Sequence, residues 1–248
     1  MTGSPPVNIA SLLPRAELTD RQRNEMFELL VQYFDGVTRR QFERDLAEKN
    51  WVILIRTAEC LAGFSTLLAY ESWFEGQPVS VIYSGDTIVA PDARGTTALA
   101  RTWIASVNRL RENYPRGPYY WLLLTSGFRT YRFLPVFWRE FYPRFDTPTP
   151  PDRKRLLDHL ARERFAERYD PTSGIVRFSQ PQRLRGALGE IPVGRTADPH
   201  VGFFLSRNPS HVDGDELVCL TELSDGNLTP AGRRMVEPRN RELHHSAR

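Results

Sequence analysis

The stretch of the sequence with the clearest chemical potential lies between residues 79 and 110, where a strand pattern passes through a turn into a helix pattern. Gly95 lets the backbone turn sharply there, and the neighbouring Arg94 can pair with phosphate. The first N–H groups of a helix have no partner inside the helix, so such a turn can bind an anion. An ordinary β–α connection is the alternative that the same pattern allows.

An acidic residue precedes this turn inside the strand pattern of Val79–Val89. Asp86 follows Gly85, which gives its side chain room. A carboxylate in this position can take a proton from an alkylammonium group, whose pKa is about 10. The alternative is that Asp86 hydrogen-bonds to the backbone turn at Gly85, and both interpretations stay open. Glu71, on the neighbouring strand, is the second choice for a base.

The elements on either side of the turn follow from the hydrophobic pattern. Residues 79–89 are rich in β-branched and aromatic residues, which favours a strand. Apolar residues then recur at spacings of four, four and three, at Leu99, Trp103, Val107 and Leu110. This spacing places them on one face of a helix that packs on the core.

Two helices and two strands are predicted before the central strand. Thr19 with Gln22, and Thr38 with Gln41, both fit a capping box at a helix start. The strands expected here are Trp51–Arg56 and Cys60–Tyr70, with a first strand near Val7–Ala10. The chain then turns at a Gly-Gln-Pro sequence into the central strand.

The downstream half is predicted to contain a buried strand and several shorter elements. Tyr119–Leu124 is a continuous apolar run, as expected for a strand buried on both faces. Phe133, Phe137 and Phe141 repeat at helical spacing and are interpreted as core. The other elements expected are an amphipathic helix over residues 151–169 and strands at Ile175–Phe178, Val201–Ser206 and Glu216–Leu223. The last two strands are expected to close the fold as an antiparallel pair.

Composition limits the class of protein. The chain has 248 residues, 40% hydrophobic and 25% charged, which is typical of a globular protein. Only two of the 33 basic residues are lysines, and a net charge of +3 is too small to argue nucleic-acid binding. Cys60 and Cys219 are expected as packing thiols, and no Cys/His spacing predicts a metal site. Without a signal-peptide or membrane-spanning pattern, the expected location is cytoplasmic.

The segment V-A-P-D-A-R-G-T-T-A-L-A resembles the pyrophosphate-binding segment of the GCN5-related N-acetyltransferase (GNAT) superfamily. In that superfamily a strand ends in a hydrophobic-x-Pro step, and an Arg/Gln-x-x-Gly-x-Gly/Ala loop opens a long helix. The matching positions are Val89, Pro91, Arg94 and Gly95. Thr97 stands where the second glycine is usual, and Ala98 or Leu99 where glycine or alanine is usual. A bulkier residue narrows the approach of a pyrophosphate to the backbone.

The resemblance implies an α/β (α+β) fold with a mixed central sheet flanked by helices. It implies one domain over residues 16–230, with a helical insertion at about 147–170. A flexible lead-in is expected at 1–15 and a flexible tail at 231–248. In this superfamily the strand after the long helix diverges from the central strand, and the pantetheine arm of coenzyme A lies in the gap.

The resemblance also implies an activity, the transfer of an acyl group from a thioester donor to an amine by direct attack in a ternary complex. The donor is expected to contact Ile88, Val89, Ala90, Arg94, Gly95, Thr96, Thr97, Ala98 and Ser126. Within this set the backbone of residues 88–90 would polarise the thioester carbonyl, through a β-bulge that frees an N–H group. The catalytic residues expected are Asp86 as base and Tyr131 and Tyr142 as proton donors to the thiolate.

Donor and partners stay open in part. The donor implied is acetyl-CoA or another acyl-CoA, and the acceptor a small-molecule or peptide amine. Because the loop has fewer glycines than usual, an acyl carrier protein or an aminoacyl-tRNA is a second donor hypothesis. A non-catalytic acyl-CoA-binding module is the third. No membrane partner is expected, and the oligomeric state, with a dimer among the options, is not determined by the sequence.

Overall fold

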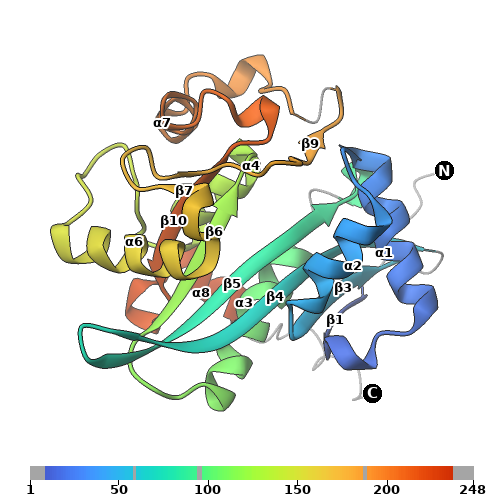
Figure 1. Cartoon of the computed structure of the whole chain (residues 1–248), viewed down its shortest axis with the longest axis horizontal. Coiled ribbons are helices and arrows are strands. Elements are labelled where there is room, and N and C mark those ends of the chain that lie inside the picture. The colour runs from blue at the N-terminus through green and yellow to red at the C-terminus, as the bar shows by residue number, and fades with distance from the viewer. Residues whose placement is uncertain (1–8, 58–59, 94–96, 187–188, 237–248) are drawn as a thin grey trace, which may run out of the picture.

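A computed structural model describes residues 9–57, 60–93, 97–186 and 189–236. Its centre is an eight-stranded mixed sheet in the order β1-β3-β4-β5-β6-β10-β8-β7 (Figure 1). The strands are β1 (Ile9–Pro14), β3 (Trp51–Arg56), β4 (Leu61–Phe74), β5 (Gln77–Val89), β6 (Tyr119–Thr125), β7 (Tyr169–Asp170), β8 (Ile175–Val176) and β10 (Glu216–Glu222). Within the described strands, β5 and β6 are the one parallel pair.

Helices cover both faces of this sheet. One face, called here the α2/α6 face, carries α1 (Asp20–Tyr33), α2 (Arg39–Ala47) and α6 (Pro151–Phe165). The other, the α3 face, carries α3 (Ala98–Leu110), α4 (Phe128–Tyr131), α5 (Phe133–Phe137), α7 (Pro199–Arg207) and α8 (Pro230–Val236). The predicted fold class, a mixed sheet flanked by helices, is confirmed.

The buried strand β6 shows how the apolar run is used. Tyr119, Trp121 and Leu123 pack on the α3 face, whereas Leu122 and Leu124 pack on the α2/α6 face. Every residue of β6 is buried, because side chains alternate across the sheet and both faces are covered. The continuous apolar pattern therefore predicted this strand correctly.

The parallel pair comes apart halfway along, at a point called here the fork. β5 and β6 pair from Ser80–Tyr119 to Ser84–Leu123. Beyond that rung, β5 stays with β4 while the end of β6 stays with β10, so the two strands diverge (Figure 1). The divergence implied by the resemblance is confirmed by this register.

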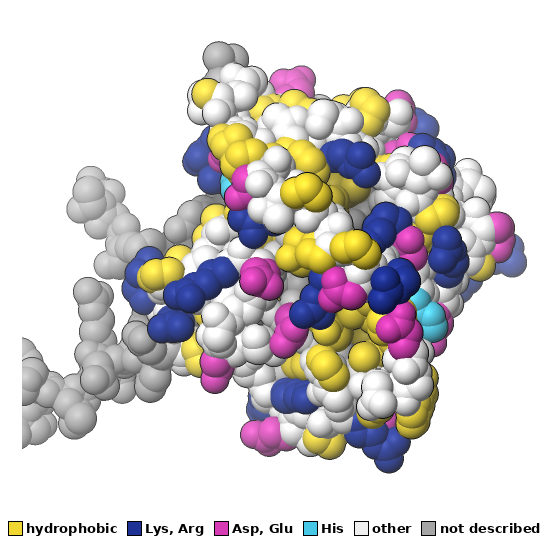
Figure 2. Space-filling view, turned by 90° about the vertical axis from the view of Figure 1, so that its left-hand side faces the viewer, with side chains coloured by type: hydrophobic (Ala, Val, Ile, Leu, Met, Phe, Trp, Pro, Cys, Tyr) yellow, Lys and Arg dark blue, Asp and Glu magenta, His cyan; other side chains and the backbone are white. Residues whose placement is uncertain are grey.

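The described surface mixes both signs of charge on the face formed by α6 and the β4–β5 hairpin (Figure 2). Arg155 pairs with Glu75 at 2.9 Å, and Lys154 pairs with Asp158 at 2.6 Å. Because acidic and basic groups alternate here, this face offers no extended patch of one sign for a polyanion.

Several expectations about elements need correction. Val201–Ser206, predicted as a strand, lies within α7, where the Asp198 side chain accepts a hydrogen bond from the His200 N–H and Pro199 begins the helix. The β-branched and aromatic composition favoured a strand, but Asp-Pro is a helix-start signal. β10 consequently pairs with β6 and β8, so the expected closing pair does not form.

The ends of the domain also differ from expectation. The first strand, expected near Val7–Ala10, is found at Ile9–Pro14, within the segment expected as a flexible lead-in, and pairs along its length with β3. Pro230–Val236 forms α8 on α3 where the tail was expected to begin. The helix containing Phe133 and Phe137 ends before Phe141, although all three pack in or against the core. Cys219 is buried as expected, but Cys60 is exposed.

The two predicted capping boxes form to different extents. Thr19 accepts from the Gln22 N–H, and the Gln22 side chain accepts from the Thr19 N–H. Thr38 accepts from the Gln41 N–H, but the Gln41 amide instead donates to the carbonyl of Gln180 at 3.4 Å. That contact brings the segment after β8 over α2.

Candidate functional site

A cavity of about 700 Å³ lies at the fork and is lined from both faces of the sheet. From the α3 face it is lined by Leu99, Trp103, Trp121, Leu123, Phe128 and Phe133. From the α2/α6 face it is lined by Lys49, Tyr83, Asp86, Arg164 and Glu216, among others. The cavity therefore crosses the sheet where the two strands diverge, with an aromatic half and a charged half.

The aromatic half is rigidly packed. The rings of Trp103 and Trp121 lie 4.2 Å apart between centroids, and Phe133 packs edge-on against both. The indole N–H of Trp121 donates to the Ser84 hydroxyl at 2.9 Å, at the last rung before the strands diverge. Rigid apolar walls exclude water, which strengthens any electrostatic interaction made inside.

Asp86 lies in the charged half, at an irregularity in the ladder between β4 and β5. Ser65 pairs with Thr87 and Leu67 with Ser84, so Gly85 and Asp86 together face Thr66. Among the described residues, none forms a hydrogen bond or an ion pair with the side-chain carboxylate of Asp86. Burial raises the pKa of Asp86 to about 6; Lys49 opposes this rise and Asp45 adds to it. The group is thus poised to exchange a proton near neutral pH.

Glu216 is a second carboxyl in the same cavity, at the first residue of β10. Burial, together with the nearby charge of Asp86, raises the pKa of Glu216 to about 8. No described residue forms a hydrogen bond or an ion pair with the Glu216 carboxyl. A carboxyl with a raised pKa can ionise once a cationic ligand lies beside it.

Replacing Glu216 with glutamine should stabilise the fold in a pH-dependent way. The raised pKa, about 8 against an ordinary 4.5, means that the folded state keeps a proton that the unfolded chain releases between these values. Wild-type stability is therefore lost as pH rises from about 4.5 to 8, and the glutamine variant avoids this loss. We expect Glu216→Gln to raise Tm by about 5 °C more at pH 8 than at pH 5. An equal change at both pH values in thermal unfolding would contradict the assignment.

Two cations flank Tyr83 on the floor of the charged half. The Lys49 ammonium lies 5.3 Å from the ring centroid and the Arg164 guanidinium 5.2 Å. Arg164 also pairs with Glu48. Lys49 is 6% exposed, and its burial lowers its pKa. The charged half therefore holds both signs, brought together from α2, β5, α6 and β10.

Four residues predicted from the sequence line this cavity: Asp86, Ile88, Val89 and Ser126. Ala90 does not line it, and its N–H donates to the carbonyl of Ala62 at 2.8 Å. The expected bulge at residues 88–90 is instead at Gly85–Asp86. The Ala90 amide is therefore engaged within the sheet.

Tyr131, predicted as a proton donor, lies in the core and outside the cavity lining. Its side chain is fully buried, packs against Phe141 and Phe204, and its hydroxyl donates to the carbonyl of Pro143 at 2.9 Å. Burial raises the pKa of Tyr131. The Tyr131 hydroxyl therefore has a protein acceptor and lies away from the fork cavity, and its role as a proton donor stays a prediction.

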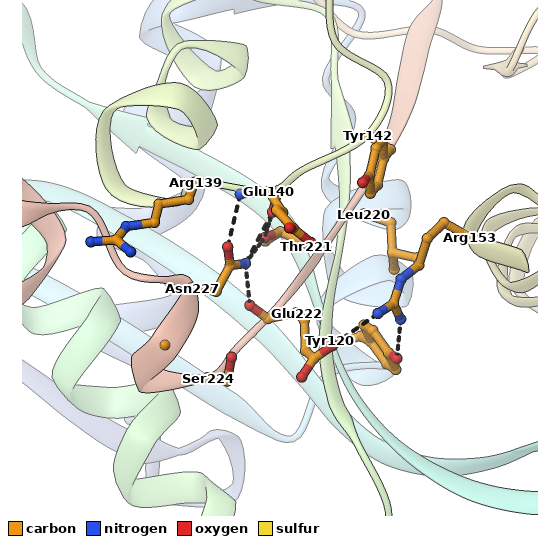
Figure 3. Close-up of a pocket in the computed structure, with 11 residues that line it drawn as sticks. Tyr120, Arg139, Glu140, Tyr142, Arg153, Leu220, Thr221, Glu222, Ser224 and Asn227 are labelled. Carbon is orange, nitrogen blue, oxygen red and sulfur yellow. Dashed lines mark hydrogen bonds and ion pairs between the residues drawn. The ribbon is translucent and has the colours of Figure 1, made fainter. Parts of the chain in front are cut away.

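Tyr142 lines a separate cavity of about 320 Å³ between β10 and the segment before α6 (Figure 3). At the centre of this region the Asn227 amide donates to the carbonyls of Glu140 and Glu222 and to the Thr221 hydroxyl. Its oxygen accepts from the Glu140 N–H at 2.8 Å. Asn227 thus ties two segments together, and Tyr142 stands apart from Asp86.

The expected donor loop is only partly described. Arg94, Gly95 and Thr96 lie outside the described residues, so their predicted contacts stay predictions. Thr97 is the residue before α3, and its side chain caps no N–H group. Ala98 begins α3, and neither Thr97 nor Ala98 lines the fork cavity.

The sequence-based reasoning missed Lys49, Arg164 and Glu216. Each comes from an element distant in sequence from the central strand, and only the fold brings them to Asp86. One signal was available for Lys49, since it is one of two lysines in an arginine-rich chain. For Glu216 the signal was an acid directly before the apolar run Leu217–Leu220.

The described residues contain no cluster of three or more His, Cys, Asp or Glu side chains able to hold a metal ion. None of their helices has the length and apolar character to cross a membrane.

Comparison with known proteins gives similarity at the level of architecture. No protein-family model and no curated protein matches the chain. A GCN5-related N-acetyltransferase from Kribbella flavida aligns at 14% identity over 50% of this chain and 32% of its own, with a TM-score of 0.39. A conserved protein of unknown function from Enterococcus faecalis V583, described as a probable N-acyltransferase, aligns at 12% identity over 87% and 66%, with a TM-score of 0.42.

A GCN5-related N-acetyltransferase from Anabaena variabilis aligns at 18% identity over 50% of this chain and 31% of its own, with a TM-score of 0.38. The chain thus spans about a third of the Kribbella and Anabaena structures and 66% of the Enterococcus one. At these identities and TM-scores the similarity assigns neither a family nor an activity. The observed mixed sheet flanked by helices, with one parallel pair among the described strands that diverges after a helical crossover, agrees with the arrangement expected from the sequence.

Proposed function

We propose that this chain is an N-acyltransferase that moves an acyl group from acyl-CoA to an amine bound in the same cavity. The observation that carries the proposal is the fork cavity, which joins an aromatic half to a half with two carboxyls, those of Asp86 and Glu216, that have no partner among the described residues. The arm that carries a thioester binds in a channel that excludes water, and an ammonium ion binds beside carboxylates. The cavity offers the two environments on opposite faces of one sheet.

The donor would enter from the α3 face. Its arm would lie between the diverging ends of β5 and β6, against Leu99, Trp103 and Phe133. Ser126 lines the cavity just past the end of β6, where its hydroxyl can donate to the sulfur. The residues before α3 would hold the pyrophosphate at a helix N-terminus.

The acceptor would enter from the α2/α6 face as an ammonium ion. Glu216 and Asp86 provide two carboxyls, and the phenol ring of Tyr83 forms the floor between them. Burial in this half lowers the pKa of the incoming ammonium and raises that of Asp86, so the proton can pass between them. Asp86 acts as general base in this scheme.

The reaction then balances without a covalent enzyme intermediate. The ammonium gives a proton to Asp86, and the free amine attacks the thioester carbonyl to form a C–N bond. The tetrahedral intermediate collapses with loss of the C–S bond. The second proton of the nitrogen passes to the thiolate through the Ser126 hydroxyl, which gives its own proton to the sulfur and takes up the one from nitrogen. The products are an amide and the free thiol.

Calorimetry and a thiol-release assay test this proposal together. We expect acetyl-CoA or a longer acyl-CoA to bind and to release thiol when small amines are added. A desulfo analogue should bind without releasing thiol. Binding without release against the whole amine panel would favour a non-catalytic binding module. Absence of binding by every acyl-CoA would favour a donor carried by an acyl carrier protein or tRNA.

A further inference from the structure

Lys49 is an enclosed amine with little to hold its charge. It lies just past α2, is 6% exposed and lines the fork cavity. Among the described residues, its one hydrogen-bond acceptor is the Asp45 carbonyl, 2.9 Å from Nζ. An ammonium has three donors, so two are left facing the cavity and the Tyr83 ring. Lysine is rarely this buried without a full set of partners.

The amine lies at the crossing point of the cavity. Gly85 is the first residue of β5 past the last rung shared with β6. A methyl group added at Gly85 would lie 2.5 Å from Lys49 Cε and 3.2 Å from Nζ, so the side chain rests directly on this glycine. The Lys49 amine therefore stands at the fork, beside the path proposed for the thioester.

Charged groups around Lys49 act in both directions on its ionisation. Burial is the largest influence and lowers its pKa, and Arg164 lowers it further. Asp86, Glu48 and Asp45 partly oppose this. The balance is a lowered pKa, so more of this amine is unprotonated near neutral pH than for an exposed lysine. The Asp86 carboxylate is also at hand as a proton acceptor.

We propose that Lys49 is itself acylated by a thioester bound in the fork cavity. This inference rests on the proposed function, since it needs the donor in the same place. The Nζ lone pair attacks the thioester carbonyl, a C–N bond forms and the C–S bond breaks. The proton leaves Nζ and passes by way of Asp86 to the departing thiolate, which becomes the thiol. The product is a stable amide at Lys49, formed once per chain.

The amide has a consequence for the site. It removes a positive charge beside Asp86 and adds an acyl group to the cavity at Nζ, which lies close to Gly85. Acylation of Lys49 should therefore obstruct the crossing point and slow transfer to an external amine. The modification would therefore inhibit the enzyme when the thioester donor is present and no amine acceptor is bound.

The chain provides its own reference in Lys154, its only other lysine. Lys154 Nζ is held by Asp158, at 2.6 Å to both oxygens, and donates to the Pro171 carbonyl at 2.9 Å. The full chain is incubated with acetyl-CoA and, separately, with the acetyl thioester of N-acetylcysteamine, which needs no nucleotide site. Acylation at each lysine is then followed by peptide mass spectrometry. We expect Lys49 to react about tenfold faster than Lys154 or more.

A second measurement separates this inference from the proposed function. Preincubation with donor alone should slow later transfer to an external amine in the wild type, whereas Lys49→Arg should show no such time-dependent loss. Labelling of Lys49 by the small thioester alone would support the inference and remove coenzyme A as the donor. Transfer to external amines with Lys49 no more reactive than Lys154 would overturn the inference and leave the proposed function standing. Absence of transfer to any amine, including Lys49, would overturn both.

Discussion

Replacing Asp86 with asparagine is expected to lower kcat/KM for amine acylation by about 10²- to 10⁴-fold, the usual contribution of a positioned general base. Asparagine keeps the size of the side chain but cannot accept the ammonium proton. Asp86 lines the fork cavity without a described partner, so the substitution breaks no hydrogen bond within the described protein. The rate should therefore fall without a fall in Tm, since the raised pKa of Asp86 makes its carboxylate destabilising above about pH 6.

The pH profile makes this test specific. Because burial raises the pKa of Asp86 to about 6, wild-type kcat/KM should rise with pH through about 6 as the carboxylate forms. Asp86→Asn should lose this rise. A suitable control is Glu222→Gln. Glu222 lies at the far end of β10, outside the fork cavity, and pairs with Arg153 at 3.3 Å. An identical rise in the Asp86→Asn variant would exclude Asp86 as the base.

Replacing Gly117 with alanine should produce the largest loss of stability, about 3 kcal/mol or more of unfolding free energy. Gly117 has φ +64°, and an added Cβ would lie 1.7 Å from the backbone oxygen of Pro78. No side-chain movement relieves a clash with backbone. Gly76 is a matched control, with φ +78° and nothing within 4 Å of an added Cβ. Gly76→Ala should cost only about 1 kcal/mol, the backbone strain alone.

The position of Gly117 explains why this loss reaches the site. The Ser80 N–H donates to the Pro118 carbonyl at 2.9 Å, and Arg111 donates to the Gly117 carbonyl at 2.6 Å. These contacts fix where β5 and β6 begin to pair, and hence where they separate. Urea unfolding of both alanine variants provides the measurement. Equal losses at the two glycines would show that the close approach to Pro78 is not limiting.

The elements that the sequence predicted well are those whose pattern depends on burial alone. Trp51–Arg56 forms β3 with the predicted bounds, and Tyr119–Leu124 is found within β6. The run at Val201–Ser206 has strand-like composition but forms α7, because capping by Asp198 and the start at Pro199 decide the backbone. Local composition does not tell which of the two signals, the strand-like residues or the helix start, prevails. That depends on the elements against which the segment packs, which the local sequence does not show.

The site divides in the same way. Asp86 was predicted because it lies within the strand–turn–helix segment that also carries the resemblance. Lys49 reaches it from the turn after α2, and Glu216 from the start of β10, so only long-range packing reveals them. The two predicted tyrosines, Tyr131 and Tyr142, do not line the fork cavity. They were chosen for the chemistry of their hydroxyl groups, which does not tell where in the fold a side chain lies.

The cationic wall of the fork cavity has a chemical consequence of its own. It is built from Arg44, Arg129, Arg164 and Arg168 with a single lysine, and all but two of the 33 basic residues of the chain are arginines. A guanidinium stays protonated at any physiological pH, so it offers no electron pair to an activated carbonyl. A thioester bound in the cavity would therefore not acylate these arginines. Within the described lining, Lys49 is the one side-chain amine that a thioester could acylate.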